Sequence, residues 1–202
     1  MIVLIPFKTS NPKSRLSKLL NEDERREFAY EMLLDVIDAI GDLAKVKVVS
    51  PEPLDLDVEV IKDSRGLDEC INDRLKIVPR AIIMSDLPLL NKEVLERFFS
   101  QPGDVVIAPG RKGGTNMLLV RKTGFRVSYH YGSFLKHIRI SKELGYSYKI
   151  FDSFFASVDV DDESDILELM IHGKGKRSWK FLRNLGFDVE FARTPRLIIP
   201  SN

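Results

Sequence analysis

Short aliphatic runs alternate with longer amphipathic segments along almost the whole chain, and this alternation limits the fold more than any other feature. The aliphatic runs predict strands at residues 2–5, 46–49, 58–61, 81–84, 105–108, 117–120 and 154–158. The amphipathic segments predict helices at residues 22–40, 67–78, 92–99 and 134–144, and another after residue 162. Strands that alternate with helices pair in parallel through right-handed crossovers. The sequence therefore predicts an α/β domain with a mostly parallel central sheet flanked by helices.

The predicted helix at residues 22–40 carries the clearest boundary signals. Asn21 is a favoured N-cap residue, and the three acidic residues that follow it suit the positive end of a helix dipole. Gly41 predicts the end of this helix. Further along, Asp162 or Ser164 is expected to cap the helix that follows it.

The 202 residues suit one domain, residues 1–202, with residues 174–202 as a basic C-terminal extension. Trp179 is expected there on a solvated amphipathic helix or, alternatively, at a homodimer contact. Lys and Arg number 31 against 30 Asp and Glu, so the net charge of +1 argues against nucleic acid or an anionic membrane as partner. No run of about 20 apolar residues is present. Cys70 has no partner for an internal disulfide, so we expect a cytoplasmic protein.

Four polar segments each follow a predicted strand, at residues 6–15, 85–88, 109–116 and 159–161. Ligands of open α/β sheets bind outside the carboxyl ends of the strands, so we expect these segments to converge at one edge. Residues two apart on an extended chain face the same side, so Asp159 and Asp161 can share a cation, with Asp86 beside them. Such carboxylates suit Mg²⁺. The alternative is that Asp161 only caps the next helix and Asp159 is solvated.

Basic residues in the first of these segments predict an anion site. Lys8, Lys13 and Arg15 lie where the phosphates of a nucleotide are expected, and an ordinary basic surface loop is the alternative. The glycine-rich segment 110–116 can present backbone N–H groups to an anion or form a plain turn, and it lacks the Gly-Lys-Ser/Thr sequence of a Walker loop. His137 is expected as a packed or capping side chain on a helix.

Six sequence segments, taken in order, resemble a known family. They are IPFKTSNPKSRLS, RGLDECI, SDLPLL, APGRKGGTNMLL, YGSFLKHI and FASVDVDDESDI. Together they are similar to the CofC-type 2-phospho-L-lactate guanylyltransferases, which act in the biosynthesis of coenzyme F-420, and the resemblance covers nearly the whole chain. GGTN and YGSF are its most specific parts, because SDLP and DxD are shared with other nucleotidyltransferases of the same fold.

The resemblance implies a single-domain, Rossmann-like (GT-A-like) nucleotidyltransferase that forms a homodimer. It would transfer GMP from GTP to 2-phospho-L-lactate, or to phosphoenolpyruvate, and release pyrophosphate. It implies Mg²⁺ held by Asp86, Asp159 and Asp161. The residues it places at the phosphorylated acid are Gly114, Thr115, Asn116, Gly132 and Ser133. Those it places at the nucleotide are Pro6, Lys8, Arg15, Gly66, Leu67 and Asp68, and it makes Lys8, Arg15 and Asp86 catalytic.

Two positions depart from the family pattern: Asp68 stands where the family usually has Asn, and His130 and Tyr131 alter the spacing before Ser133. The alternative enzyme is another nucleotidyltransferase of the same fold, acting on a molybdopterin or a sugar phosphate. The alternative of another class is a non-catalytic nucleotide-binding relative. The GGTN and YGSF segments favour phospholactate. The reaction needs no strong general base, because the attacking phosphate oxygen is already ionised at neutral pH.

Overall fold

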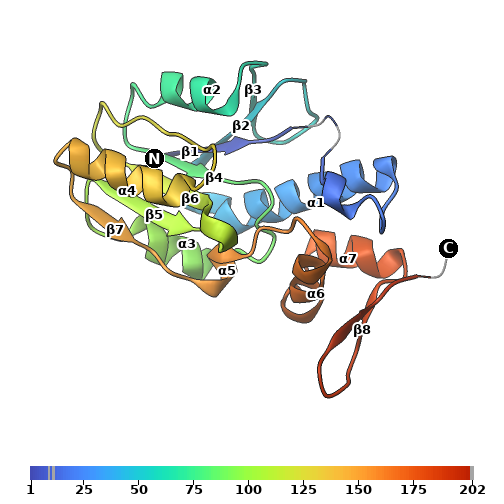
Figure 1. Ribbon diagram of the computed structural model, residues 1–202. Helices are drawn as coiled ribbons and strands as arrows, with labels where there is room; N and C mark the ends of the chain where they lie inside the picture. Colours follow the sequence, from blue (N-terminus) through green and yellow to red (C-terminus); the bar gives the residue numbers. More distant parts are fainter. Residues whose placement is uncertain (9, 11, 201–202) are drawn as a thin grey trace.

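Buried aliphatic strands form a seven-stranded sheet in the computed structural model, which describes residues 1–8, 10 and 12–200 (Figure 1). The strand order is β3-β2-β1-β4-β6-β5-β7. The strands are β1 (Ile2–Pro6), β2 (Lys45–Ser50), β3 (Glu59–Lys62), β4 (Arg80–Ile83), β5 (Val105–Pro109), β6 (Thr115–Val120) and β7 (Tyr148–Ile150). Every pairing is parallel except those of β6, which runs antiparallel to both β4 and β5. The mostly parallel sheet predicted from the sequence is confirmed.

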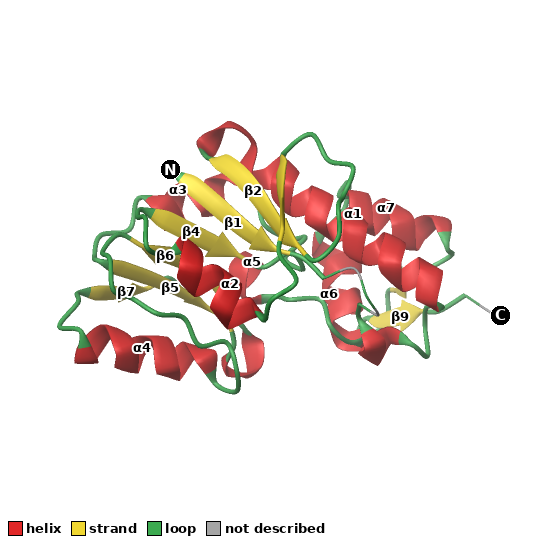
Figure 2. Ribbon diagram, turned by 90° about the horizontal axis from the view of Figure 1, so that it is seen from above, coloured by secondary structure: helices red, strands yellow, loops and turns green. Residues whose placement is uncertain are grey.

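Helices cover both faces of the sheet (Figure 2). They are α1 (Glu22–Ile40), α2 (Leu67–Arg74), α3 (Lys92–Phe99), α4 (Ser133–Glu143), α5 (Phe154–Ser157), α6 (Glu163–His172) and α7 (Arg177–Asn184), with 3₁₀ turns η1 (Ser14–Leu16), η2 (Gly41–Leu43) and η3 (Arg111–Gly113). Alternate residues of a strand face opposite sides, so Val3 and Ile5 pack under α1 and α3, whereas Leu4 packs under α2. The result is two apolar cores, one on each side of the sheet.

Capping explains where α1 begins and ends. The Asn21 side chain accepts a hydrogen bond from the Glu24 backbone N–H at 3.0 Å, and the Glu24 carboxylate accepts one from the Asn21 N–H at 2.8 Å. Gly41 ends the helix with φ of 46°, a conformation that glycine adopts without strain. The boundaries predicted from these residues are confirmed.

The prediction of a strand at residues 154–158 is wrong. Residues Phe154–Ser157 form the single helical turn α5, in which the backbone N–H groups of Ala156 and Ser157 donate to the Ser153 carbonyl. Aromatic residues favour strands on average, but only Ala156 of this turn is buried. The strand preference of the aromatic residues therefore does not decide the conformation of this segment. The edge strand β7 lies just before this turn and was not predicted. Helix α2 is also shorter than predicted and ends at Arg74.

The C-terminal extension packs against the rest of the domain. Leu182 on α7 is fully buried in the core shared with α1, and the Asp35 carboxylate on α1 accepts hydrogen bonds from the backbone N–H groups of Arg177 and Ser178. Trp179 is half-buried and donates from Nε1 to the Met170 carbonyl, so α7 is not the solvated helix expected from the sequence. Strands β8 (Asp188–Glu190) and β9 (Arg196–Ile198) form a separate antiparallel hairpin. No helix in the described part of the chain is long and apolar enough to cross a membrane.

Candidate active site

A cleft of about 680 Å³ opens beyond the carboxyl ends of β1, β3 and β4. Seven of the residues predicted to bind nucleotide or metal line it: Pro6, Lys8, Lys13, Gly66, Leu67, Asp86 and Asp161. The polar segments after β1 and β4 and the segment before α6 therefore meet at one edge of the sheet, where the topology predicts a ligand.

An ammonium group bridges two carboxylates on the wall of this cleft. Lys13 Nζ lies 2.7 Å from Asp86 Oδ2 and 2.7 Å from Asp161 Oδ1, and only 9% of the Lys13 side chain is exposed. Burial lowers the pKa of Lys13, but the two carboxylates outweigh burial and the pKa is raised above its ordinary value. The Lys13 backbone adopts the left-handed conformation with φ of 54°. That conformation is uncommon for residues other than glycine, so the lysine is held in place by its surroundings.

The segment between α5 and α6 is extended and carries both Asp159 and Asp161. Val160 donates from its backbone N–H to the Asp86 carbonyl at 3.0 Å, and its side chain is fully buried. Asp159 and Asp161 alternate with buried valines and so face away from the core, as expected for residues two apart on an extended chain. Asp162, not Asp161, is the N-cap of α6. The alternative in which Asp161 serves only as a cap is therefore wrong.

Asp159 lies near the other carboxylates but has a different partner. Its Oδ1 accepts a hydrogen bond from Asn116 Nδ2 at 3.3 Å. Burial, and next the negative charge of Asp86, raise the pKa of the Asp159 carboxyl. Within residues 1–8, 10 and 12–200, no three His, Cys, Asp or Glu side chains are already arranged as a metal-ligand set. Of the three aspartates predicted to hold a metal ion, Asp86 and Asp161 share one cation, the ammonium group of Lys13.

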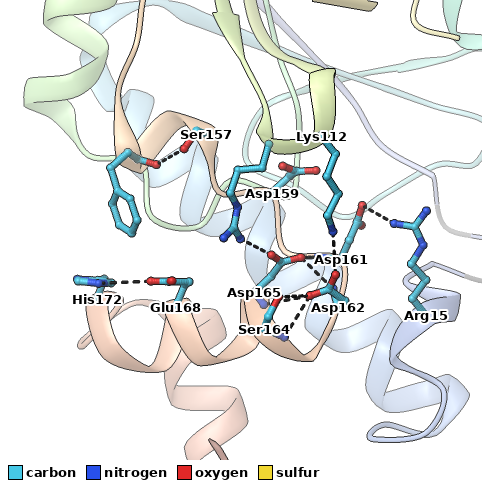
Figure 3. A network of polar contacts seen from close by, with 12 residues as sticks. Arg15, Lys112, Ser157, Asp159, Asp161, Asp162, Ser164, Asp165, Glu168 and His172 are labelled. Atoms are coloured by element: carbon cyan, nitrogen blue, oxygen red, sulfur yellow. Dashed lines mark hydrogen bonds and ion pairs between the residues drawn. The ribbon is translucent and has the colours of Figure 1, made fainter. Parts of the chain in front are cut away.

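Ion pairs join the glycine-rich segment between β5 and β6 to the segment at residues 158–162, here called the aspartate segment, and to the first turn of α6 (Figure 3). Lys112 Nζ lies 2.8 Å from Asp162 Oδ2, and Arg111 pairs with the buried carboxylate of Asp165. Asn116 also donates to the Ala156 carbonyl at 3.0 Å. A Cβ on Gly110 would collide with the Asn116 side chain, so glycine is required there. Asn116, predicted at the acid, thus contacts the aspartate segment.

Thr115 and Ser133, predicted to share one phosphate, do lie together. Ser133 Oγ donates to Thr115 Oγ1 at 3.2 Å, and both residues are buried, whereas Gly114 is half-buried and Gly132 is exposed. Thr115 is the first residue of β6 and Ser133 is the first residue of α4, the next element along the chain. Neither residue is among those that line the cleft.

Two residues predicted at the nucleotide lie outside the cleft lining. Arg15 is 68% exposed, and its Nη1 is 3.8 Å from Asp161 Oδ2, so it stands at the margin (Figure 3). Asp68 accepts a hydrogen bond from the Tyr129 backbone N–H at 2.8 Å. It therefore stabilises the segment before α4 and does not line the cleft.

Sequence reasoning missed an ion network on the far wall of the cleft. Asp63 accepts from Arg65 Nη2 at 2.7 Å and from Arg74 Nη1 at 2.8 Å. The hydrogen bond from Arg65, followed by that from Arg74, holds the pKa of Asp63 well below its usual range. Both Asp63 and Arg65 line the cleft. No spacing in the sequence marks this network, because its members follow a strand and belong to a short helix with ordinary surface charge.

The sequence is similar to that of one family over nearly its whole length. Residues 1–200 match the family model described as "Guanylyl transferase CofC like". A 2-phospho-L-lactate guanylyltransferase of Archaeoglobus fulgidus is 61% identical over 198 residues, which cover 98% of this chain and 96% of that protein. A protein of the same name from Ferroglobus placidus is 55% identical over 199 residues, covering 98% of each chain.

Solved structures with low sequence identity share the fold. A proposed nucleotide-diphospho-sugar transferase of Desulfovibrio desulfuricans G20 superposes with a TM-score of 0.74 at 17% identity, covering 91% of this chain and 94% of that one. A cytidylyltransferase of Leptospira borgpetersenii has a TM-score of 0.56 at 12% identity, covering 90% and 91%. The fold is therefore that of nucleotidyltransferases, as the sequence predicts.

Proposed function

The chain belongs to the CofC-like guanylyl transferase family, and from this membership we propose that it transfers GMP from GTP to the phosphate of 2-phospho-L-lactate and releases pyrophosphate. This reaction is a step of coenzyme F-420 biosynthesis. The observation that carries the chemistry is the meeting of Lys13, Asp86 and Asp161 on the wall of the cleft. The site therefore offers negative carboxylates for a metal ion and a positive ammonium group for the triphosphate.

The nucleotide is assigned to the cleft. Its volume of about 680 Å³ is within the range of ligand pockets, and Lys8 and Lys13 are among its lining residues. Lysine and arginine contact phosphate oxygens through charge-assisted hydrogen bonds, so Lys8 and Lys13, with Arg15 at the margin, are assigned to the triphosphate. Gly66 and Leu67 at the start of α2 line the opposite wall and are assigned to the nucleoside.

The residues fit a Mg²⁺ ion. Asp86 and Asp161 already place oxygens within 2.7 Å of one cationic group, and Mg²⁺ usually takes one or two carboxylates together with substrate phosphates. The raised pKa of Asp159, caused by burial and by Asp86, marks a local excess of negative charge that a cation would relieve. When bound, the ion would neutralise charge that develops on the triphosphate. Asp86 and Asp161 would hold it, with Asp159 beside them.

The phosphorylated acid is assigned to Thr115 and Ser133, with the backbone at Gly114 and Gly132. The two hydroxyls lie 3.2 Å apart, so Ser133 supports the Thr115 hydroxyl, which is the one that donates to a phosphate or carboxylate oxygen. The glycine-rich segment that leads to Thr115 is bound to the aspartate segment through Lys112 and Asp162. This ion pair therefore joins the segment assigned to the acid to the segment that carries the aspartates of the nucleotide site.

The reaction is an in-line substitution at the α-phosphorus of GTP. A phosphate oxygen of the acid forms the new P–O bond, the bond from the α-phosphorus to the bridging oxygen breaks, and pyrophosphate leaves with that electron pair. The nucleophile is already an anion, so positioning and charge neutralisation carry the rate acceleration. Lys13 contributes a fixed positive charge, and the Thr115–Ser133 pair orients the attacking group.

The proposal is tested by measuring pyrophosphate release from the purified chain. GTP, ATP and CTP are each combined with 2-phospho-L-lactate, phosphoenolpyruvate and 3-phosphoglycerate in the presence of Mg²⁺, and products are identified by mass spectrometry. We expect the highest kcat/KM for GTP with 2-phospho-L-lactate. Turnover of GTP with a molybdopterin or a sugar phosphate, and none with the three acids, would contradict the proposal.

We further propose a homodimer in solution. The proposal follows from family membership, and light scattering during gel filtration tests it. A mass twice that of the chain is expected, and a monomer at micromolar concentration would contradict it.

A further inference from the structure

A histidine that the reaction does not use directly lies behind the proposed acid site. His137 on α4 is fully buried, and both of its ring nitrogens have partners. Nε2 lies 3.0 Å from the backbone nitrogen of Ser128, and Nδ1 lies 2.9 Å from Thr115 Oγ1. The rings of Phe125 and Tyr129 pack around it, with centroids 5.9 and 5.2 Å away. The imidazole is therefore held in one position and one orientation.

The contact with Ser128 determines which nitrogen carries the proton. A backbone N–H can only donate, so Nε2 must accept and carries no proton. Burial lowers the pKa of His137 to about 4, so the ring is neutral at neutral pH and its single proton is on Nδ1. Nδ1–H then donates to Thr115 Oγ1.

This arrangement limits what the Thr115 hydroxyl can do. A hydroxyl oxygen has two lone pairs and one proton. Thr115 Oγ1 accepts from His137 Nδ1 and from Ser133 Oγ, so both lone pairs are taken. The Thr115 proton is the one remaining hydrogen-bonding capacity of this group. A hydroxyl in that state can donate to an anionic oxygen but cannot accept from a ligand N–H or O–H.

We propose that His137 is a positioning residue for the acid substrate: by donating to Thr115, it makes that hydroxyl a donor directed at a phosphate or carboxylate oxygen. The inference rests on the proposed function, because it assumes that Thr115 contacts the phosphorylated acid. It adds that the site selects for an anionic acceptor group, since a ligand donor at this point would find no lone pair. Ser133 supports the same orientation from the other side.

Two substitutions separate this role from packing. The side-chain amide of Asn can take the place of Nδ1, so His137→Asn keeps a donor toward Thr115. His137→Gln extends its amide to the place of Nε2 and keeps the Ser128 contact instead. We expect His137→Gln to raise KM for 2-phospho-L-lactate about 3- to 10-fold, the effect of one lost neutral hydrogen bond, with KM for GTP unchanged. His137→Asn should stay within about 2-fold of the wild type, although it leaves the larger cavity.

A double-mutant cycle and a control complete the kinetic test. In a Thr115→Val background, His137→Gln should have no further effect on the KM for the acid, because the group that it orients is gone. His172→Gln, at an exposed histidine on α6 that pairs with Glu168, should leave both KM values unchanged. If His137 only fills space, Asn should be the more damaging substitution and its effect should add to that of Thr115→Val.

The tautomer is measured independently of activity by ¹⁵N NMR of histidine-labelled protein without substrates. The proton of His137 should be on Nδ1, and the Nδ1 resonance should shift in Thr115→Val. A proton on Nε2, or equal loss of acid affinity in the Asn and Gln variants, would overturn the positioning role. A wild type that shows the expected tautomer but no pyrophosphate release with any acid would overturn the proposed function instead.

Discussion

Lys13 places one positive charge between Asp86 and Asp161, which come from two other segments of the chain. Two carboxylates brought this close would repel each other without a cation between them. The ammonium satisfies both and is itself almost excluded from water, so its interaction with them is screened less than at an exposed ion pair. The three groups act as one unit in which each side chain holds the position of the others.

Removing the charge of either carboxylate tests their role in the reaction. Asp86→Asn and Asp161→Asn keep the shape of the side chain but should lower kcat for pyrophosphate release by about 100-fold or more, because charge stabilisation of the transition state is worth several kcal/mol. Asp159→Asn should also lower kcat for pyrophosphate release. Glu163→Gln is the matched control, since Glu163 is an exposed acidic residue in the first turn of α6 and lies outside the cleft lining. Wild-type rates for Asp86→Asn and Asp161→Asn at saturating Mg²⁺ would contradict the assignment.

The hydroxyl groups of the acid site can be deleted one at a time. Thr115→Val keeps the volume of the side chain and should raise KM for 2-phospho-L-lactate roughly 10- to 150-fold, since a hydrogen bond to a charged group is worth about 1.5–3 kcal/mol. Ser133→Ala should have a smaller effect in the same direction, because Ser133 donates to Thr115. GTP affinity, measured by calorimetry, should be unchanged in both. Loss of GTP affinity with normal acid kinetics would place these residues at the nucleotide.

The lowered pKa of His137 should make the free energy of unfolding depend on pH. Its pKa is lowered by burial to about 4 in the folded chain, against about 6.5 when unfolded, with Asp68 and Lys136 as the nearest charges. Between these values the unfolded state binds more protons, so stability falls as the pH is lowered from about 6.5 to about 4. The wild type should lose up to about 3 kcal/mol more than His137→Asn over this range. Urea unfolding at pH 7 and pH 4.5 measures the difference, and parallel losses would contradict it.

The candidate site could be predicted from the sequence where its residues follow strands. Asp86 comes after the apolar strand β4, and the rule for parallel sheets is enough to bring it to this edge. Asp159 and Asp161 follow the helical turn α5 and not the predicted strand, so the rule does not account for their place. The role of Lys13 could not be predicted beyond its place in a basic loop. It depends on contacts with residues 73 and 148 positions away and on a left-handed backbone conformation that no local pattern in the chain indicates.

At the scale of elements, the first turn of α6 connects the two halves of the site. The buried Asp165 carboxylate accepts from the backbone N–H groups of Asp161 and Asp162, at 2.9 and 3.0 Å, and also pairs with Arg111 (Figure 3). One side chain thus fixes the backbone of the aspartate segment and the end of the glycine-rich segment. The helix begins where it does because Asp162 and Asp165 form a reciprocal capping box.

Asp165→Asn should therefore destabilise the protein and slow the reaction together. An amide can accept at one atom only, so either the Arg111 pair or the backbone contacts are lost, at a cost of about 1–3 kcal/mol in the free energy of unfolding. Glu168→Gln, one turn further along the same helix, changes an exposed pair with His172 and should cost less than about 0.5 kcal/mol. Chemical denaturation of both variants measures these values. Equal stability of the two would show that the bridge contributes little.

The elements that could be predicted are those whose ends are marked by local chemistry. Asn21, Gly41 and Asp162 each mark a helix end in the sequence and do so in the structure. The direction of β6 could not be predicted, because an aliphatic run looks the same in parallel and antiparallel pairing. The turn α5 was assigned to a strand because Phe154 and Phe155 favour strands locally, whereas tertiary packing decides their conformation.

At the scale of the whole molecule, the C-terminal extension completes the core on one face of the sheet. Helix α7 lies along α1, with Leu182 buried and Phe181 stacked on Phe28 at a centroid distance of 6.1 Å. The Asp35 carboxylate satisfies the first N–H groups of α7 from within α1. Removing this segment would uncover both an apolar face and a buried carboxylate, so we expect it to be part of the folding unit.

A chain that ends at Gly173 should fail to unfold cooperatively in urea, because the face of α1 that α7 covers would be exposed to water. The matched control is Phe191→Ser in the β8–β9 hairpin. Phe191 is 93% exposed, so its substitution should change the free energy of unfolding by less than about 0.5 kcal/mol. Circular dichroism during denaturation follows both. A normal, cooperative transition in the shortened chain would show that the extension is an accessory segment.

The positive charge that Lys13 supplies also affects whether the protein needs a metal ion to fold. Because Asp86 and Asp161 already share a counter-charge from a side chain of the same polypeptide, we expect this edge of the sheet to fold without a bound metal ion. The protein should then remain folded in strong chelators. The Mg²⁺ proposed for the reaction can arrive already bound to the nucleotide, so we expect a chelator to slow turnover and to leave the fold intact.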